Sequence, residues 1–129
     1  MKEEVQNWVD YAYEDLTMAD LALKEKIYNQ VCFHSQQCVE KILKAFIEFN
    51  GKIHPQTHKL ADLLSYLPEN PFEDMRDNIL LLDRFYIPTR YPDALPGTLR
   101  EGQPREDDAK EAIRVATLLF EKARKVMGF

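Results

Sequence analysis

The sequence predicts an all-α fold: an up-and-down antiparallel bundle of about five helices, three long and two short. Apolar residues recur at spacings of three and four in three long segments, and Gly, Pro, Asn and Thr residues separate these segments. A long loop rich in proline and arginine precedes the last helix. The chain has 129 residues, 45% of them hydrophobic and 30% charged, which predicts one domain over residues 1–129.

The first two helices are predicted at residues 3–26 and 29–50. In the first, the apolar residues form a single stripe of Val5, Trp8, Val9, Ala12, Leu16, Ala19 and Leu23. In the second, the apolar arc is wider, so this helix should contact neighbours on two sides and lie centrally in the bundle. Asn50 and Gly51 are expected to end it, with Gly51 in the left-handed conformation.

The second helix also carries polar residues. Its solvent face is expected to consist of Gln37, Glu40, Lys41, Lys44 and Glu48. Ser35 and Gln36 fall inside the apolar arc, so they should bond another helix or line a polar cavity. Asp15 and Asp20, which flank the stripe of the first helix, are candidate partners for them.

Three further helices follow. Thr57 is the expected N-cap of a short helix at residues 58–67. Asn70 and Pro71 open another at residues 71–85. The last helix starts at Pro104, has acidic residues in its first turn and basic residues in its last, and should end at Gly128.

Composition excludes several classes of protein. A net charge of −5 argues against a sequence-independent binder of duplex DNA. The longest aliphatic run, residues 79–82, is far too short to cross a membrane, and the first 25 residues have no apolar signal region. Cys32 and Cys38 would lie about 9 Å apart on one helix, too far for a disulfide. We therefore expect reduced, packed thiols and a cytoplasmic protein that does not contact membranes.

The loop at residues 86–103 is the most unusual segment. At 18 residues it is longer than most helix connections. It contains Arg90 and Arg100, is preceded by Arg84, and holds no lysine, while Tyr86 and Tyr91 provide rings for stacking. One interpretation is a site for a phosphate-bearing ligand. In a second, the arginines pair with acids of the bundle, and in a third the loop is a surface for a protein partner.

The sequence offers little for metal or cofactor chemistry. His34 and Cys38, and likewise His54 and His58, are four residues apart, but no second pair completes a ligand set. A Gly-rich phosphate loop and a Gly-x-Ser-x-Gly motif are both missing. We expect no metal and no cofactor.

Four short motifs together resemble the HEPN family (higher eukaryotes and prokaryotes nucleotide-binding domain). They are Ala-Tyr-Glu-Asp-Leu at 12–16, Phe-His-Ser-Gln-Gln-Cys-Val-Glu-Lys-Ile-Leu-Lys-Ala at 33–45, Pro-Gln-Thr-His-Lys-Leu at 55–60 and Thr-Arg-Tyr-Pro-Asp at 89–93. The resemblance, closest to an Arg-Tyr-Pro-Asp subgroup, implies a helical bundle that forms a homodimer in a bacterium or archaeon. It also implies frequent partnership with a minimal nucleotidyltransferase in a toxin–antitoxin-like pair.

Many members of that family are ribonucleases with an arginine followed, after four to six residues, by a histidine. Here His34, His54 and His58 all precede the first arginine, Arg76, so this motif is absent. We therefore expect a non-catalytic module that binds a nucleotide or RNA. The candidate ligand-binding residues are Arg90, Tyr91, Asp93, Arg84, Gln37, Lys41 and His58.

Two alternatives stay open. In the first, the chain is a pure interaction partner of the nucleotidyltransferase, and Arg90 has a structural role. In the second, it is a non-standard ribonuclease in which His58 acts as the acid–base group beside Arg90.

Overall fold

A computed structural model of the chain describes residues 1–67, 69–86 and 102–129. The regular elements of these residues are all helical, which confirms the predicted fold class. The three long helices are α1 (Glu3–Lys24), α2 (Tyr28–Phe49) and α5 (Glu106–Met127). The shorter elements are α3 (Leu60–Leu64), the 3₁₀ turn η1 (Glu73–Met75), α4 (Arg76–Leu81) and the 3₁₀ turn η2 (Leu82–Phe85).

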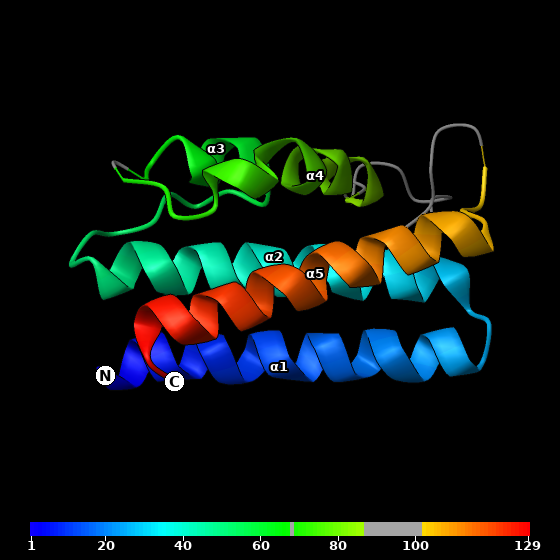
Figure 1. Cartoon of the computed structure of the whole chain (residues 1–129), viewed down its shortest axis with the longest axis horizontal. Helices are drawn as coiled ribbons and strands as arrows, with labels where there is room; N and C mark the ends of the chain where they lie inside the picture. Colours follow the sequence, from blue (N-terminus) through cyan, green and yellow to red (C-terminus); the bar gives the residue numbers. More distant parts are fainter. Residues whose placement is uncertain (68, 87–101) are drawn as a thin grey trace.

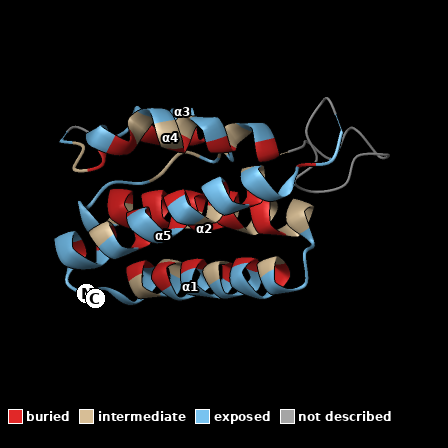
Figure 2. Cartoon of the chain, turned by 45° about the vertical axis from the view of Figure 1, so that its right-hand side comes forward, coloured by how far each residue is buried: buried red, intermediate tan, exposed pale blue. Residues whose placement is uncertain are grey.

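Helix α2 is central, as its wide apolar arc predicts. It packs against α1, α5, α3 and η2. Figure 1 shows α1 on one side of α2, the layer of α3 and α4 on the other, and α5 running along the pair. Buried residues accordingly cover much of α2 and only the inward faces of its neighbours (Figure 2). Because α2 is enclosed on three sides, only a narrow part of its surface remains for contact with solvent.

The ends of the long helices agree with the predicted signals to within a few residues. Gly51 and Gly128 both have left-handed backbones, with φ of 76° and 81°. At the start of α5, the Arg105 N–H donates to the Asp108 carboxylate at 2.9 Å. This helix begins at Glu106, two residues after the predicted Pro104.

The short helices differ from the prediction. Helix α3 begins at Leu60, and Thr57 does not cap it: the Thr57 hydroxyl accepts the N–H of Lys59 instead. The N–H groups of Leu60 and Ala61 donate to the Asp83 carboxylate at 2.7 and 3.2 Å. Burial raises the pKa of Asp83, an effect that these two N–H groups oppose. The cap therefore comes from η2, more than twenty residues along the chain.

The helix predicted at residues 71–85 is also interrupted. Asn70 does accept the N–H of Phe72, at 2.9 Å, as expected of a capping residue. The chain then forms η1, α4 and η2 in succession rather than one continuous helix. Apolar spacing alone does not distinguish 3₁₀ from α-helical turns in so short a segment.

Both cysteines are free and buried. Burial is the main cause that raises the pKa of Cys32 to about 12, and it also raises that of Cys38. Their thiols are thus packing groups rather than nucleophiles. In the described part of the chain, no helix has an apolar stretch long enough to span a bilayer.

The Asp83 cap leads to a stability prediction. Replacing Asp83 with Ala removes the acceptor of two N–H groups at the start of α3, and should lower the free energy of unfolding by about 1–2 kcal/mol. Replacing Thr57 with Ala, the matched control, removes a partly exposed hydroxyl that bonds the Lys59 N–H and the Asp62 carboxylate but no N–H of α3, and should cost less than about 1 kcal/mol. Urea unfolding of both variants measures the difference, and equal losses would contradict this account of the cap.

Candidate functional site

The polar side of α2 differs from the predicted solvent face. Gln37, Lys41 and Glu48 are partly exposed, but Glu40 and Lys44 are buried, with only 3% and 6% of their surface accessible. The prediction that these two residues face solvent was wrong. The covering groups come from other segments: His58 lies against Glu40, and the Trp8 ring of α1 lies 5.4 Å from the Lys44 ammonium.

Glu40 is the centre of this arrangement. Its carboxylate accepts from the Lys44 ammonium at 2.9 Å and faces His58 Nδ1 at 3.2 and 3.3 Å. The Gln37 amide approaches the same carboxylate at 3.5 Å. A buried carboxylate loses its water, so these neighbours must replace the hydration that it had in the unfolded chain.

His58 is oriented by this carboxylate. Because carboxylate oxygens accept hydrogen bonds, the hydrogen of the imidazole lies on Nδ1, and Nε2 points away from Glu40. The side chain is 56% exposed, and its ring stacks on Tyr86 with centroids 5.0 Å apart and planes 28° apart. The main-chain oxygen of His58 accepts from Gln36 Nε2 at 3.1 Å. Bonds from two residues of α2 therefore hold His58.

A second carboxylate, Asp15 of α1, holds the other edge of α2. It is buried and accepts from both His34, at 2.8 Å to Nδ1, and Lys41. Asp15 thus bonds α2, but not through Ser35 or Gln36 as expected. Ser35 Oγ is the one buried side-chain nitrogen or oxygen without a partner in the described residues.

Asp20, the other expected partner, was predicted wrongly. It pairs on the surface with Lys24 at 3.2 Å. Asp15 and Asp20 lie on different sides of α1, and only Asp15 turns toward α2.

The third histidine is fixed on both sides of its ring. His54 Nε2 lies 3.2 Å from the Glu48 carboxylate, and Nδ1 lies 3.1 Å from the oxygen of Pro55. Trp8 Nε1 donates to the same Glu48, and the Trp8 and His54 rings meet edge to face at 5.2 Å. All three histidines therefore bond carboxylates, but only His34 and His58 keep a nitrogen without a protein partner among the described residues.

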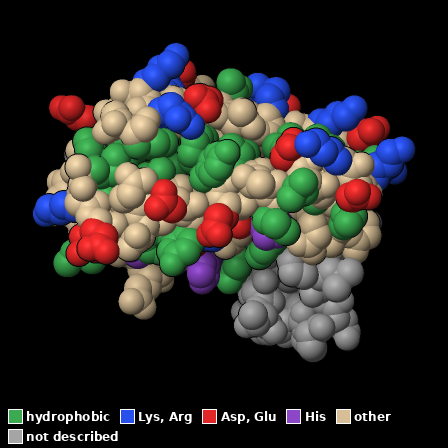
Figure 3. All heavy atoms as spheres, turned by 90° about the horizontal axis from the view of Figure 1, so that it is seen from below, with side chains coloured by type: hydrophobic (Ala, Val, Ile, Leu, Met, Phe, Trp, Pro, Cys, Tyr) green, Lys and Arg blue, Asp and Glu red, His purple; other side chains and the backbone are tan. Residues whose placement is uncertain are grey.

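Between these anchored groups runs a partly exposed row of α2 that we call the polar strip. Its members are spaced three or four residues apart or adjacent, and they are Gln30, Phe33, His34, Gln37 and Lys41. Asp15 borders the strip on the α1 side, and His58 with Tyr86 borders it on the other. Figure 3 shows histidines along one edge of the face that α1 presents, whereas most of the lysine and arginine side chains in view lie elsewhere.

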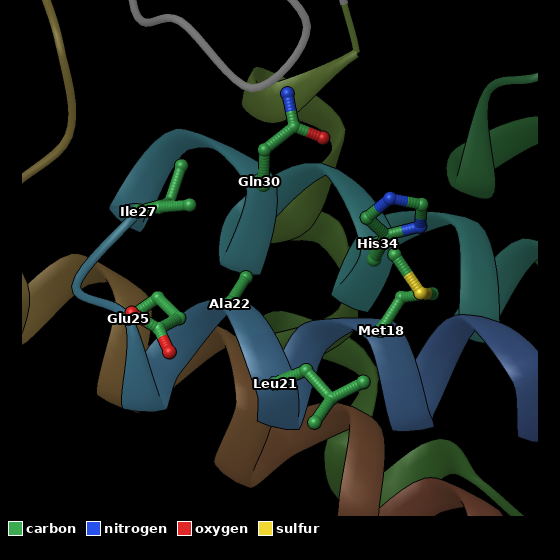
Figure 4. Close-up of a pocket in the computed structure, with 7 residues that line it drawn as sticks. All are labelled: Met18, Leu21, Ala22, Glu25, Ile27, Gln30 and His34. Atoms are coloured by element: carbon green, nitrogen blue, oxygen red, sulfur yellow. The ribbon is translucent and has the colours of Figure 1, made fainter.

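The strip ends in a small hollow near the turn between α1 and α2 (Figure 4). Its volume is about 210 Å³, and its lining residues are Met18, Leu21, Ala22, Glu25, Ile27, Gln30 and His34. Met18, Leu21, Ala22 and Ile27 make the walls largely apolar, and Met18, Leu21 and Ile27 are each about half exposed. Gln30 and His34 are members of the strip that also line the hollow (Figure 4).

Of the predicted ligand-binding residues, the structure brings Gln37 and His58 together through Glu40, and places Lys41 one turn from Gln37. Arg84 lies in a different environment. Its guanidinium donates to Asp108 of α5 at 3.3 Å and lies 4.7 Å from the centre of the Phe85 ring. This is the interpretation in which an arginine pairs with an acid of the bundle.

Arg90, Tyr91 and Asp93 lie outside the described residues. Within the described ranges, no group of three or more His, Cys, Asp or Glu side chains is arranged to hold a metal ion.

Sequence reasoning missed three features that shape the site: Asp15 as the partner of His34 and Lys41, Glu40 as a buried anchor, and Tyr86 as the ring beside His58. A signal was available only for the row on α2, where polar residues recur at 34, 37, 41, 44 and 48. Such a row is ordinary for a solvated face, so it does not by itself indicate burial.

The buried ion pair leads to a second prediction. Replacing Glu40 with Ala leaves the Lys44 ammonium buried without its anion, and should lower the free energy of unfolding by about 3–5 kcal/mol. Replacing Glu111 with Ala, which breaks an exposed pair with Arg114, should cost less than about 1 kcal/mol. Denaturant unfolding compares them. A double variant, Glu40→Leu with Lys44→Met, should recover most of the stability lost in Glu40→Ala. Equal losses in Glu40→Ala and Glu111→Ala would contradict a larger contribution of the buried pair to stability.

Comparison with known proteins places the chain in a family. The family model for the HEPN domain matches residues 5–126. A protein of Methanocaldococcus jannaschii named "Putative toxin MJ1304" is 30% identical over 124 residues, covering 88% of this chain and 82% of the relative.

Two solved structures share the fold. One is ST0689, described as an archaeal HEPN homologue, with 33% identity, a TM-score of 0.75 and coverage of 98% of this chain and 99% of that one. The other is TT1696 from Thermus thermophilus, with 31% identity, a TM-score of 0.78 and coverage of 96% of this chain and 98% of that one. Both the match over residues 5–126 and these likenesses lead to one conclusion: the chain belongs to the HEPN family.

Proposed function

We propose that this protein is a non-catalytic module that binds a nucleotide or single-stranded RNA at the polar strip of α2. The observation that carries the proposal is the arrangement around Glu40, where the His58–Tyr86 ring stack and the Gln37 amide stand beside one another. Aromatic stacking and amide hydrogen bonds are the contacts by which proteins recognise unpaired bases.

The phosphate of a nucleotide also needs a positively charged side chain to bind it. Lys41, the lysine of the strip, contacts Asp15, and the buried Lys44 contacts Glu40, so this side of α2 offers little uncompensated positive charge for a phosphate. We assign the phosphate to Arg90, which follows Tyr86 by four residues in the sequence and precedes Tyr91 and Asp93, the other proposed ligand-binding residues of this segment. Arginine suits this role because its guanidinium forms two parallel bonds to a phosphate.

The first test is a calorimetric titration with ATP, GTP and short single-stranded RNAs. The wild type should bind at least one of them, and Tyr86→Leu and His58→Ala should each weaken binding roughly tenfold through loss of stacking. His54→Ala is the matched control, because His54 also bonds a carboxylate of α2 but has both ring nitrogens engaged. Absence of heat with every ligand, or equal losses in the control, would refute the proposal.

A non-standard ribonuclease is the second candidate, and one observation favours it. His58 is held by a carboxylate and leaves Nε2 exposed, which is the geometry of an oriented general acid–base. The RNAs of the titration, labelled at one end, decide between the two functions. Cleavage by the wild type that is lost in His58→Ala would favour the nuclease, whereas intact RNA supports a binding module.

For partners, we propose a homodimer that acts with a small nucleotidyltransferase in a toxin–antitoxin-like pair. The name of the M. jannaschii relative supports the toxin-like role. In such a dimer, Arg90 from the two chains would face one cleft, where two like charges repel when it is empty and bind an anion more strongly than one charge does.

The dimer has its own test. Added phosphate should raise the melting temperature of the wild type, because the anion relieves this repulsion. Arg90→Glu should lose the response while remaining dimeric by light scattering. A monomer at concentrations of about tens of micromolar, where dimers of ordinary affinity persist, or an unchanged response in the variant, would contradict the proposal.

A further inference from the structure

The side-chain amide of Gln37 is fixed in one orientation. Its Nε2 donates to Gln36 Oε1 at 2.7 Å and lies 3.5 Å from a Glu40 carboxylate oxygen. The Glu40 oxygen can only accept. Gln36 Oε1 is also fixed as an acceptor, because Gln36 Nε2 donates to the main-chain oxygen of His58 at 3.1 Å, and a carbonyl oxygen only accepts.

This chain of bonds removes the usual ambiguity of an amide. If the Gln37 amide were rotated by 180°, its oxygen would face two acceptors and both bonds would be lost. The carboxylate of Glu40 and the main chain of His58 thus determine which end of the Gln37 amide faces outward. That end is the oxygen.

The outward oxygen has no hydrogen-bond donor in the part of the chain that the structure describes. No donor to Gln37 Oε1 is found among residues 1–67, 69–86 and 102–129, and the atom is not one of the buried unpaired atoms of these residues. Phe33 stands one turn earlier on the same strip and is partly exposed, and the His58–Tyr86 stack contacts the same Glu40. A fixed acceptor therefore lies one helical turn after Phe33, beside the carboxylate that holds His58.

We propose that Gln37 is a specificity-determining residue, which favours ligands that present an N–H donor and disfavours ligands that present a carbonyl at the same place. The inference rests on the nucleotide-binding function proposed above, and it names the ligand class as nucleotides whose base carries an exocyclic amine. A carbonyl opposite Gln37 Oε1 leaves two acceptors facing each other without a hydrogen, which costs binding free energy.

Pairs of nucleotides that differ at one group test the proposal. ATP and ITP differ in an amine against a carbonyl at C6 of the purine, and CTP and UTP differ in the same way at C4 of the pyrimidine. Calorimetric titration of the wild type should give about tenfold tighter binding of ATP than of ITP, and a like ratio for CTP over UTP.

Two variants identify the residue responsible. In Gln37→Lys, the ammonium can still donate to Gln36 and Glu40, but it presents a donor outward, so the ratio of the ATP affinity to the ITP affinity should fall below one. The added charge affects both triphosphates equally and cancels in the ratio. Gln6→Met is the matched control: Gln6 lies on α1, outside the strip, where its amide donates to Asp10 at 2.9 Å, so the ratio should stay near that of the wild type.

The outcomes separate the two proposals. Equal binding of ATP and ITP by the wild type, or an unchanged ratio in Gln37→Lys, would overturn the role of Gln37 while leaving nucleotide binding in place. Failure of all four nucleotides to bind would refute the proposed function, and this inference with it. Discrimination that is lost in Gln6→Met instead would also overturn the assignment.

Discussion

Glu40 and Lys44 bury opposite charges on the side of α2 that its sequence pattern assigns to solvent. Removal of two charges from water costs several kcal/mol for each. The pair is therefore stable only where other protein groups replace the hydrogen bonds that water made to it. The carboxylate obtains them from His58 and Gln37, and the Lys44 ammonium faces the Trp8 ring. Because His58 and Trp8 come from segments on opposite sides of α2, satisfying one ion pair fixes the position of both neighbours.

The histidines show how similar contacts produce different roles. His34 and His58 each use Nδ1 for a carboxylate, so each presents Nε2 outward beside the polar strip. His54 turns both ring nitrogens to protein oxygens and packs edge to face on Trp8. The first two imidazoles are therefore oriented but open, whereas the third is part of the packing between α1 and α2. A carboxylate neighbour alone does not distinguish these cases; the second nitrogen does.

How far the sequence predicts this protein depends on the range of the interactions involved. The three long helices follow from local apolar spacing, and Gly51 and Gly128 end two of them for local steric reasons. The start of α3 was mispredicted because its cap, Asp83, is distant in sequence, and a nearby Thr57 gives the same local signal.

The same distinction applies to the site. The burial of Glu40 and Lys44 was not predicted, because a helical wheel shows which residues share a face but not which segment covers it. The partner of Arg84 is Asp108, twenty-four positions later, and no local rule selects it among the other acids.

The bond from Asp83 to the first turn of α3 also has a dynamic consequence. It joins the two ends of the layer made of α3 and α4, so detachment of either end breaks both bonds. Such a layer should open as one cooperative unit, with the amides of Leu60 and Ala61 reporting the same opening free energy in hydrogen exchange. His58 and Tyr86 flank this unit on its two sides in the sequence, and their ring stack closes it. A ligand held by the stack would slow that exchange, so occupancy of the site and local unfolding of this layer are thermodynamically linked.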